Sequence, residues 1–199
     1  DGFYRGGGYH YDDTQIQGFS HMHLYATGLT DYGVLAAMPT DGMTSEKTVR
    51  DGYSADFSHD KEWVEPGYYA VHIDGIEVQL TATNHTALHE YRFDDTVETP
   101  TVLLDLGHSM GRGKVLEAAL DIAQGGQNFS GELIMDGEMS DPFKMYFYGA
   151  FESPPVSWGT WEGPNLSEES SVYALNNDVQ LGGWFSFEPE TTARMRIAL

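Results

Sequence analysis

The stretch GYYAVHIDGIEVQLTAT, residues 67–83, decides the fold class. Apolar and polar residues alternate through both of its halves, and a period of two is typical of a strand with one buried face. Asp74 and Gly75 lie between the halves, and an Asp-Gly pair at such a position is a tight-turn signal. The stretch therefore predicts an antiparallel β-hairpin.

Further segments of strand length lie outside this hairpin. They are short and either apolar or alternating, and they occupy residues 101–106, 144–151, 182–187 and 194–199. Many short strands at such spacing predict an all-β fold, an antiparallel β-sandwich or a barrel, with little helix.

The segment KVLEAALDIA at 114–123 can be interpreted in two ways. It is rich in helix formers, which favours a helix. Every second residue from Leu116 to Ile122 is apolar, however, and glycines bracket the segment. We therefore predict a strand here.

The composition limits the size of the protein and the kinds of partner. The 199 residues, 40% of them hydrophobic, suffice for one sizeable core, and we expect residues 1–199 to form a single domain. Thirty-one Asp and Glu against ten Lys and Arg give a net charge of -21, which disfavours nucleic acid and anionic membranes as partners. The sequence contains no run of 18 apolar residues, so it predicts no membrane-spanning helix. The absence of Cys excludes disulfides and thiolate metal sites.

Two histidines, His21 and His23, are the first candidates for chemistry. On an extended strand their imidazoles would share one face, about 7 Å apart, and this spacing recurs in metal sites. His59, His89 and His108 could complete such a site. The alternative is that both histidines are hydrogen-bonded core or interface residues. A single His-x-His pair is a weak metal signal, so we expect no metal in this domain.

Acidic residues are the next candidates, because a glycosidase needs two carboxylates in different environments. Asp31, Asp56 and Glu62 are considered for this role. Most of the 31 acids must lie on the solvated surface, and the sequence alone does not show which of them face each other.

Aromatic residues crowd the first 32 positions. Aromatic faces stack on sugar rings, and Tyr hydroxyls form hydrogen bonds with them. Packing in the core or at strand edges is an equally good interpretation. The residues are Tyr4, Tyr9, Tyr11, Phe19, Tyr25 and Tyr32.

Three sequons of the type N-x-S/T begin at Asn84, Asn128 and Asn165. The chain has only five Asn, and chance would give about one sequon. The excess indicates a glycoprotein, and we expect a secreted or extracellular location.

The stretch GFSHMHLYATGLTDYGVLAAMPTDG at 18–42 resembles the signature of the amino-terminal domain of glycoside hydrolase family 92. That signature typically reads G-F-S-H-T-H-L-S-G-T-G, followed by D-x-G and M-P. The similarity continues at GYHY (8–11), PGYY (66–69), TVLLDLGH (101–108) and KMYFYGAFESP (144–154). The resemblance covers nearly the whole chain, and its motifs are long and ordered.

This resemblance implies a fold and an activity. The family consists of calcium-dependent, exo-acting α-mannosidases that invert the anomeric centre, in which an amino-terminal β-sandwich joins an (α/α)6 barrel. The active site lies between the two, and the barrel supplies the general acid, the general base and most calcium ligands. We therefore expect no catalytic residue and no cofactor in this domain. Its partner would be a mannose-containing glycan or the catalytic barrel domain.

The resemblance also implies which side chains shape the sugar-binding cleft. We expect the imidazoles of the signature to hydrogen-bond the sugar or to order the domain interface. The acid of the signature would orient an imidazole or accept a sugar hydroxyl, and aromatic residues would provide apolar walls. The residues are His21, His23, Asp31, Tyr9, Phe19 and Tyr25.

The sequence also departs from the family. Met22, Tyr25 and Ala26 stand where the signature has Thr, Ser and Gly, and a Tyr there fills space that a substrate or partner domain would need. The chain starts without Met, and no barrel follows Leu199, so we expect a processed chain or a piece of a longer protein. The alternative function is a stand-alone, non-catalytic module that binds glycans or serves as a structural subunit, with a protein partner in an extracellular assembly.

Overall fold

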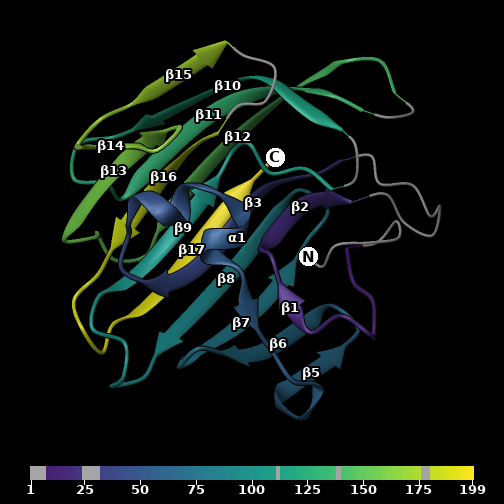
Figure 1. Cartoon of the computed structure of the whole chain (residues 1–199), viewed down its shortest axis with the longest axis vertical. Coiled ribbons are helices and arrows are strands. Elements are labelled where there is room, and N and C mark those ends of the chain that lie inside the picture. The colour runs from purple at the N-terminus through teal and green to yellow at the C-terminus, as the bar shows by residue number, and fades with distance from the viewer. Residues whose placement is uncertain (1–7, 24–31, 111–112, 138–139, 176–179) are drawn as a thin grey trace.

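Two antiparallel β-sheets that pack face to face dominate the fold (Figure 1). The computed structural model describes residues 8–23, 32–110, 113–137, 140–175 and 180–199. The all-β sandwich with little helix that the sequence predicts is confirmed. No helix in these ranges is long and apolar enough to cross a membrane.

The larger sheet has nine strands. In chain order they are β5 (Glu62–Glu65), β6 (Tyr68–Ile73), β7 (Ile76–Ala82), β8 (Thr86–Phe93), β10 (Lys114–Ile122), β11 (Asn128–Asp136), β12 (Phe143–Phe151), β15 (Val172–Leu175) and β17 (Thr192–Ala198). Their order across the sheet is β15-β10-β11-β12-β17-β8-β7-β6-β5. Some paired strands, such as β17 and β8, are far apart in the sequence, so part of the strand pairing is non-local.

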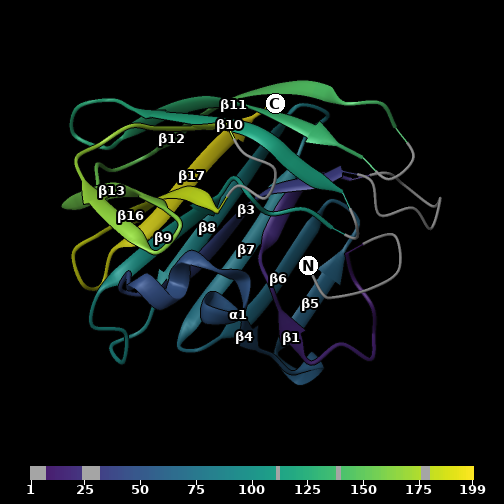
Figure 2. The ribbon, with the colours of Figure 1, turned by 45° about the horizontal axis from the view of Figure 1, so that its top comes forward.

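The smaller sheet has six strands. They are β2 (Phe19–His23), β3 (Tyr32–Asp41), β9 (Pro100–Asp105), β13 (Ser157–Glu162), β14 (Asn165–Glu168) and β16 (Leu181–Ser186), in the spatial order β14-β13-β16-β9-β3-β2. A short pair joins β1 (Gln15–Ile16) to β4 (Ala55–Asp56). The helical turns are η1 (Ser45–Thr48), α1 (Arg50–Tyr53) and η2 (His59–Lys61). Figure 2 shows α1 against the smaller sheet, and Tyr53 of this turn donates a 2.6 Å hydrogen bond to Asp105 of β9.

The hairpin predicted at 67–83 is confirmed as β6 and β7. Asp74 and Gly75 form its turn, with φ values of 45° and 79°. Two consecutive positive φ values are typical of the type I′ turn, whose twist matches the twist of the flanking strands.

The segment predicted as a strand at 114–123 is strand β10. A bulge between Val115 and Glu117 shifts its register against β11. Val115 is therefore the buried residue at this point, whereas Leu116, the first of the alternating apolar residues, is only half-buried. A bulge inserts one residue, so it reverses the alternation that the sequence pattern assumes.

Phenylalanine rings from both sheets interlock in the core. Phe185 of β16 lies 5.2 Å from Phe129 and 4.9 Å from Phe151, measured between ring centroids. Gly149 is paired with Phe129 in the register of β11 and β12, and the Phe129 ring occupies the space that a Cβ at Gly149 would need. The glycine is thus required by close packing rather than by its backbone conformation.

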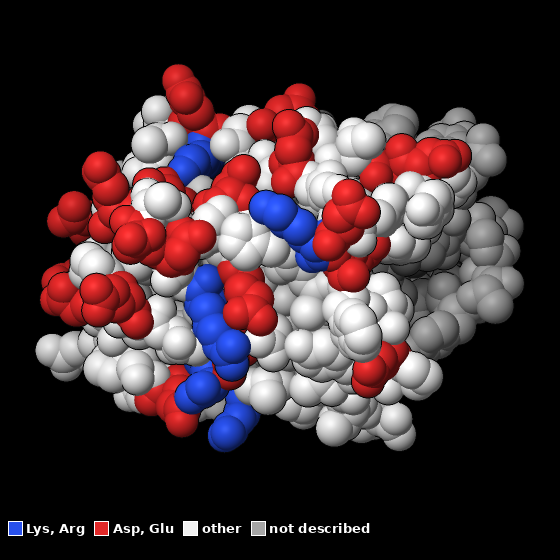
Figure 3. Space-filling model, turned by 90° about the horizontal axis from the view of Figure 1, so that it is seen from below, with Lys and Arg blue, Asp and Glu red and all other residues white. Residues whose placement is uncertain are grey.

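Acidic side chains dominate the surface, as the net charge requires. Figure 3 shows one face, on which a narrow band of basic side chains lies among more numerous acidic ones. Several basic residues are paired, as with Arg194, which lies 3.0 Å from Glu152 and also contacts Glu90.

We expect Gly149→Ala to lower the free energy of unfolding by about 1–3 kcal/mol, because the new methyl group overlaps the Phe129 ring. Urea denaturation measures the effect. Ser130→Ala, a half-buried position on the neighbouring strand, is the control and should change stability by no more than about 0.5 kcal/mol. Equal stability of the Gly149→Ala variant and the wild type would show that the ring packing at this position is not tight.

Candidate functional site

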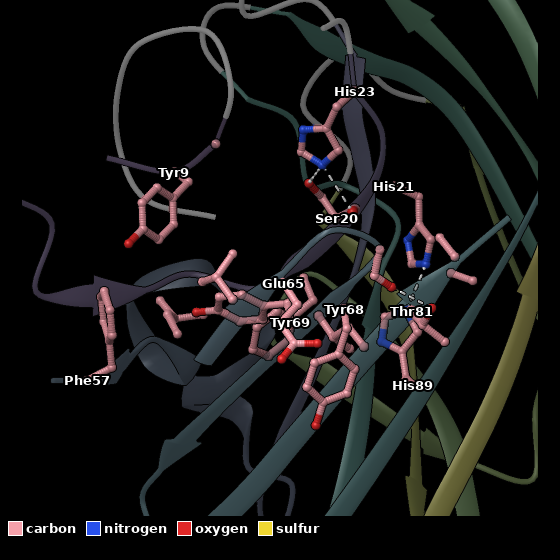
Figure 4. Close-up of a pocket in the computed structure, with 18 of the residues that line it drawn as sticks. Tyr9, Ser20, His21, His23, Phe57, Glu65, Tyr68, Tyr69, Thr81 and His89 are labelled. Atoms are coloured by element: carbon pink, nitrogen blue, oxygen red, sulfur yellow. Dashed lines mark hydrogen bonds between the residues drawn. The ribbon is translucent and has the colours of Figure 1, made fainter. Parts of the chain in front are cut away.

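A cleft of about 800 Å³ opens at the end of the sandwich where β2 faces β6, β7 and β8. The segment that precedes β1 and the end of β5 complete its described walls. Figure 4 shows side chains from these elements pointing into one space. Aromatic and histidine side chains of its lining include Tyr9, Phe19, His21, His23, Tyr69 and His89.

A hydrogen bond between His21 and His89 links the two sheets at the cleft. Their Nε2 atoms are 3.1 Å apart, and the rings are stacked with centroids 5.1 Å apart (Figure 4). His21 comes from β2 of the smaller sheet and His89 from β8 of the larger one. Both side chains are buried.

The neighbours of this pair determine where its protons lie. Nδ1 of His21 is 2.5 Å from the Leu35 carbonyl oxygen, which only accepts, so Nδ1 carries the hydrogen and Nε2 is an acceptor. Nε2 of His89 is then the donor to His21, and its Nδ1 accepts from the Tyr91 hydroxyl at 2.7 Å. This inferred arrangement satisfies every ring nitrogen while both imidazoles are neutral.

Burial supports the neutral forms. It lowers the pKa of His21 to about 4 and lowers the pKa of His89 well below its ordinary value, because a charged imidazole would lose its hydration. His108, also buried, has its pKa lowered to about 3 by the same desolvation.

His23 lies at the rim of the cleft and is half-buried. Its Nε2 is 2.9 Å from the Ser20 hydroxyl oxygen and 3.1 Å from the Ser20 carbonyl oxygen. Met22 between the two histidines has a φ of 61°, which is outside the extended region, so the fully extended backbone on which both imidazoles would share one face is interrupted here. The two imidazoles accordingly have different partners.

Comparison with known proteins decides the family. The profile of the glycosyl hydrolase family 92 N-terminal domain matches residues 1–199. This chain belongs to that family.

Solved structures of the family have the same fold. The family GH92 α-mannosidase BT3965 from Bacteroides thetaiotaomicron, in complex with mannoimidazole, superposes with a TM-score of 0.86 at 20% identity. That match covers 100% of this chain and 28% of the other. The inverting mannosidase BT2199 from the same species gives a TM-score of 0.79 at 25% identity and covers 98% and 26%.

A curated relative from Arthroderma benhamiae, described as an uncharacterized secreted glycosidase, is 28% identical over 117 residues. The match covers 53% of this chain and 15% of the relative. This chain thus covers less than a third of the length of each of these relatives.

Four of the six cleft residues expected from the resemblance line one cleft. These are Tyr9, Phe19, His21 and His23. Asp31 and Tyr25, with the neighbouring Ala26, lie outside the described residues. The assignment of these side chains to sugar binding stays a prediction.

Tyr69 and His89 also line the cleft, although the sequence did not lead us to predict them there. Register pairs Tyr69 with Leu80, and Leu80 with His89, so the three form a row across β6, β7 and β8. The alternation in the hairpin marks the inner face of this row, and extending its register to the next strand would have located His89.

Glu62, one of the acids considered for catalysis, instead binds three neighbours at the edge of the cleft. It accepts from Tyr9 at 3.0 Å, from Tyr69 at 2.8 Å and from His59 at 2.6 Å, and its side chain is only 5% exposed. Its carboxylate oxygens therefore hold the segment before β1 against the larger sheet. Asp56 is exposed, accepts from Gln15 at 2.9 Å and is not among the described lining residues.

His59 beside Glu62 has the opposite charge state to the buried pair. Its Nδ1 faces Glu62, and its Nε2 is 2.6 Å from the Tyr11 carbonyl oxygen, so both nitrogens face acceptors and both carry hydrogens. The hydrogen bond to Glu62 raises the pKa of His59 accordingly. The Tyr11 ring stacks on this imidazole at 4.3 Å.

The histidines proposed as metal ligands fall into separate groups within the described residues. His59 lies in η2 and bonds Glu62, whereas His21 bonds His89. In the described ranges no group of three or more His, Asp or Glu side chains is placed to hold a metal ion.

The sequons differ in setting. Asn84 is exposed in the turn between β7 and β8 and lines the cleft. Asn165 is exposed at the start of β14. The half-buried Asn128 accepts a 2.9 Å hydrogen bond from Tyr148. Their glycosylation stays a prediction.

The buried histidines should make stability depend on pH. The folded pKa of His89 lies below its unfolded value near 6.5, so below about pH 6.5 the unfolded state binds a proton that the folded state does not. The free energy of unfolding therefore falls as the pH drops from there, and His89 contributes a slope of about 1 kcal/mol per pH unit.

We expect His89→Gln, which cannot take up this proton, to reduce that slope by about 1 kcal/mol per pH unit between pH 6 and pH 5. Urea unfolding at a series of pH values measures it, and His85→Gln, at an exposed position, is the matched control. Identical slopes for the wild type and the His89→Gln variant would contradict a neutral buried pair.

Proposed function

We propose that this family 92 domain forms one wall of the mannose-binding cleft of a calcium-dependent, exo-acting α-mannosidase and supplies neither the general acid nor the general base. The observation that carries the proposal is the convergence of Tyr9, Phe19, His21 and His23 on one cleft. Three of these residues come from the signature stretch, and Tyr9 comes from the GYHY motif. The solved mannosidases of the same fold support it.

The chemistry of the cleft suits a sugar. Phe19 and Tyr69 are 6.4 Å apart between ring centroids and provide apolar surface from opposite sheets. Imidazole and hydroxyl groups, such as those of His23 and Tyr9, provide hydrogen bonds beside that surface. A volume of about 800 Å³ lies in the range of small-molecule sites.

Glu62 and Glu65, the carboxylates at the β5 side of the cleft, do not suit catalysis, and Asp13, from the segment before β1, is the one carboxylate besides Glu65 in the described lining. Inverting hydrolysis needs two carboxyl groups on opposite sides of the scissile bond, with room for a water molecule. Glu62 is engaged by three donors, and the exposed Glu65 accepts a 3.0 Å hydrogen bond from the Trp63 indole. We therefore assign the acid and the base to a catalytic domain that covers the open side of the cleft.

We assign calcium to that catalytic domain as well. Among the described residues, no group of three or more His, Asp or Glu side chains is placed to hold an ion. The role of this domain is to bind and orient the sugar and to exclude water from one side.

We further propose that the protein is secreted. The three sequons support this, and so does the description of the fungal relative as a secreted glycosidase. Extracellular glycans would then be available as substrates.

In the polypeptide that carries this chain, we expect His23→Ala to lower kcat/KM for an α-mannoside at least about tenfold, because a polar contact to the sugar is lost. His72→Ala, a half-buried histidine of β6 outside the cleft lining, is the control and should leave kcat/KM unchanged. Thermal unfolding of both variants confirms that they are folded. A folded His23→Ala variant with wild-type kcat/KM would overturn the proposed role of the cleft.

Removal of calcium from the same polypeptide by a chelator should abolish mannosidase activity, and added Ca²⁺ should restore it. The chelator should leave unchanged the NMR signals of His21 and His89, because we place the ion outside this domain. Activity that survives complete removal of calcium would contradict the calcium dependence without touching the cleft assignment.

A further inference from the structure

A second hollow lies on the outer face of the nine-stranded sheet. It is a groove of about 540 Å³ over β10, β11 and β12. The cleft residue His89 is buried between the sheets, whereas Tyr146 of the groove faces solvent on β12. The described linings of the groove and the cleft have no residue in common.

Strand register builds the groove as two rows of side chains. Tyr146 of β12 lies opposite Glu132 of β11, and Glu132 lies opposite Ala119 of β10. In the adjacent row, Tyr148 lies opposite Ser130, which lies opposite Asp121. Tyr146 and Tyr148 form a tyrosine wall, of which Tyr146 is in the described lining of the groove. Glu132 and Ser130 lie next to this wall, and Ala119 and Asp121 lie beyond them.

The tyrosine wall is open to solvent. The exposed fractions of Tyr146 and Tyr148 are 63% and 55%. Polar groups hold the wall in place: Tyr148 donates to Asn128 at 2.9 Å, and the Lys144 ammonium lies 5.2 Å from the centroid of the Tyr146 ring. Lys144 also pairs with Glu132 at 2.8 Å.

The opposite side of the groove is polar. Asp121 accepts a 2.7 Å hydrogen bond from the Ser171 hydroxyl, and this hydroxyl in turn accepts from the backbone N–H of Ile122 at 3.2 Å. Val172 follows as a half-buried apolar side chain. The groove therefore combines a flat aromatic surface with fixed carboxylate and hydroxyl groups.

We propose that this groove is a second carbohydrate site, which binds a neutral saccharide. A pyranose ring has an apolar C–H face, which suits the exposed face of a Tyr ring, and hydroxyl groups around it, which suit carboxylate acceptors. The ligand is uncharged, because Asp121 and Glu132 in a chain of net charge -21 repel anionic sugars.

A protein partner fits this surface less well. The centre of a protein interface is large, apolar and depleted in charge. Here the side chains around Tyr146 include Lys144, Glu132 and Ser130, so the apolar surface extends over only one or two rings. This is the scale of a sugar residue.

Affinity electrophoresis of the polypeptide that carries this chain tests the proposal independently of mannosidase activity. The native gels contain soluble α-mannan, a soluble neutral β-glucan or polygalacturonate. We expect at least one neutral polysaccharide to retard migration, and polygalacturonate to have no effect. Tyr146→Ala and Tyr148→Ala should each weaken the binding about tenfold, whereas Tyr146→Phe should retain it.

Two controls locate the binding. Trp63, on β5 at the far edge of the same sheet, is 61% exposed, and Trp63→Ala should migrate like the wild type. His23→Ala weakens the proposed mannose-binding cleft and should leave unchanged the part of the retardation that Tyr146→Ala removes, so failure of the cleft assignment and failure of this proposal are distinguishable. The proposal is overturned if no neutral polysaccharide retards the protein, if folded Tyr146→Ala and Tyr148→Ala variants bind normally, or if Trp63→Ala loses binding equally.

Discussion

The arrangement of the cleft depends on the hydrogen bond between His21 and His89, which joins the two sheets through neutral imidazoles. Elsewhere in the described core the sheets meet through apolar side chains, and hydrophobic burial has no fixed direction. The histidine pair is directional, because the Leu35 carbonyl at one end and the Tyr91 hydroxyl at the other fix both proton positions. A buried polar group left without its partner costs about 1–3 kcal/mol, so the chain is strongly held to one position of β2 over β8.

At the edge of the cleft, Glu62 and His59 form a charged pair, in contrast to the neutral pair of His21 and His89. Glu62 is a nearly buried carboxylate, and it is tolerated because His59, Tyr9 and Tyr69 all donate to it. Because its pKa is raised, His59 stabilises the folded state below about pH 6.5, and this contribution is lost as the pH rises through the raised value. The histidine pair behaves in the reverse way and loses stability as the pH falls. Together, these contributions to the stability of the folded state are greatest near pH 6.5.

Much of this architecture could be predicted from local patterns. Alternation in residues 67–83 identified the hairpin, and the resemblance selected His21 and His23 for the cleft. The rest depends on contacts between distant residues. His89 lies 68 positions from its partner, and its strand β8 pairs with β7 on one side and, on the other, with β17 at the end of the chain. Local departures from regular strand geometry could not be predicted either: the φ of Met22 is positive, and the periodicity of the sequence does not indicate it.

In the outer groove, the alternation of buried and exposed residues along β12 explains which side chains face solvent but not which residue types they are. Met145 and Phe147 fill the core, so the pleat requires Tyr146 and its neighbours at intervals of two to face outward. The pleat does not require them to be aromatic. Acidic residues occupy many exposed positions of this chain, and a charge at Tyr146 would serve solubility better than a ring that is 63% exposed. A cross-strand tyrosine pair would also stabilise an isolated sheet, but Tyr146 and Tyr148 lie on one strand and face Glu132 and Ser130 instead. Packing therefore leaves these two rings unexplained, and binding of a sugar ring gives them a function.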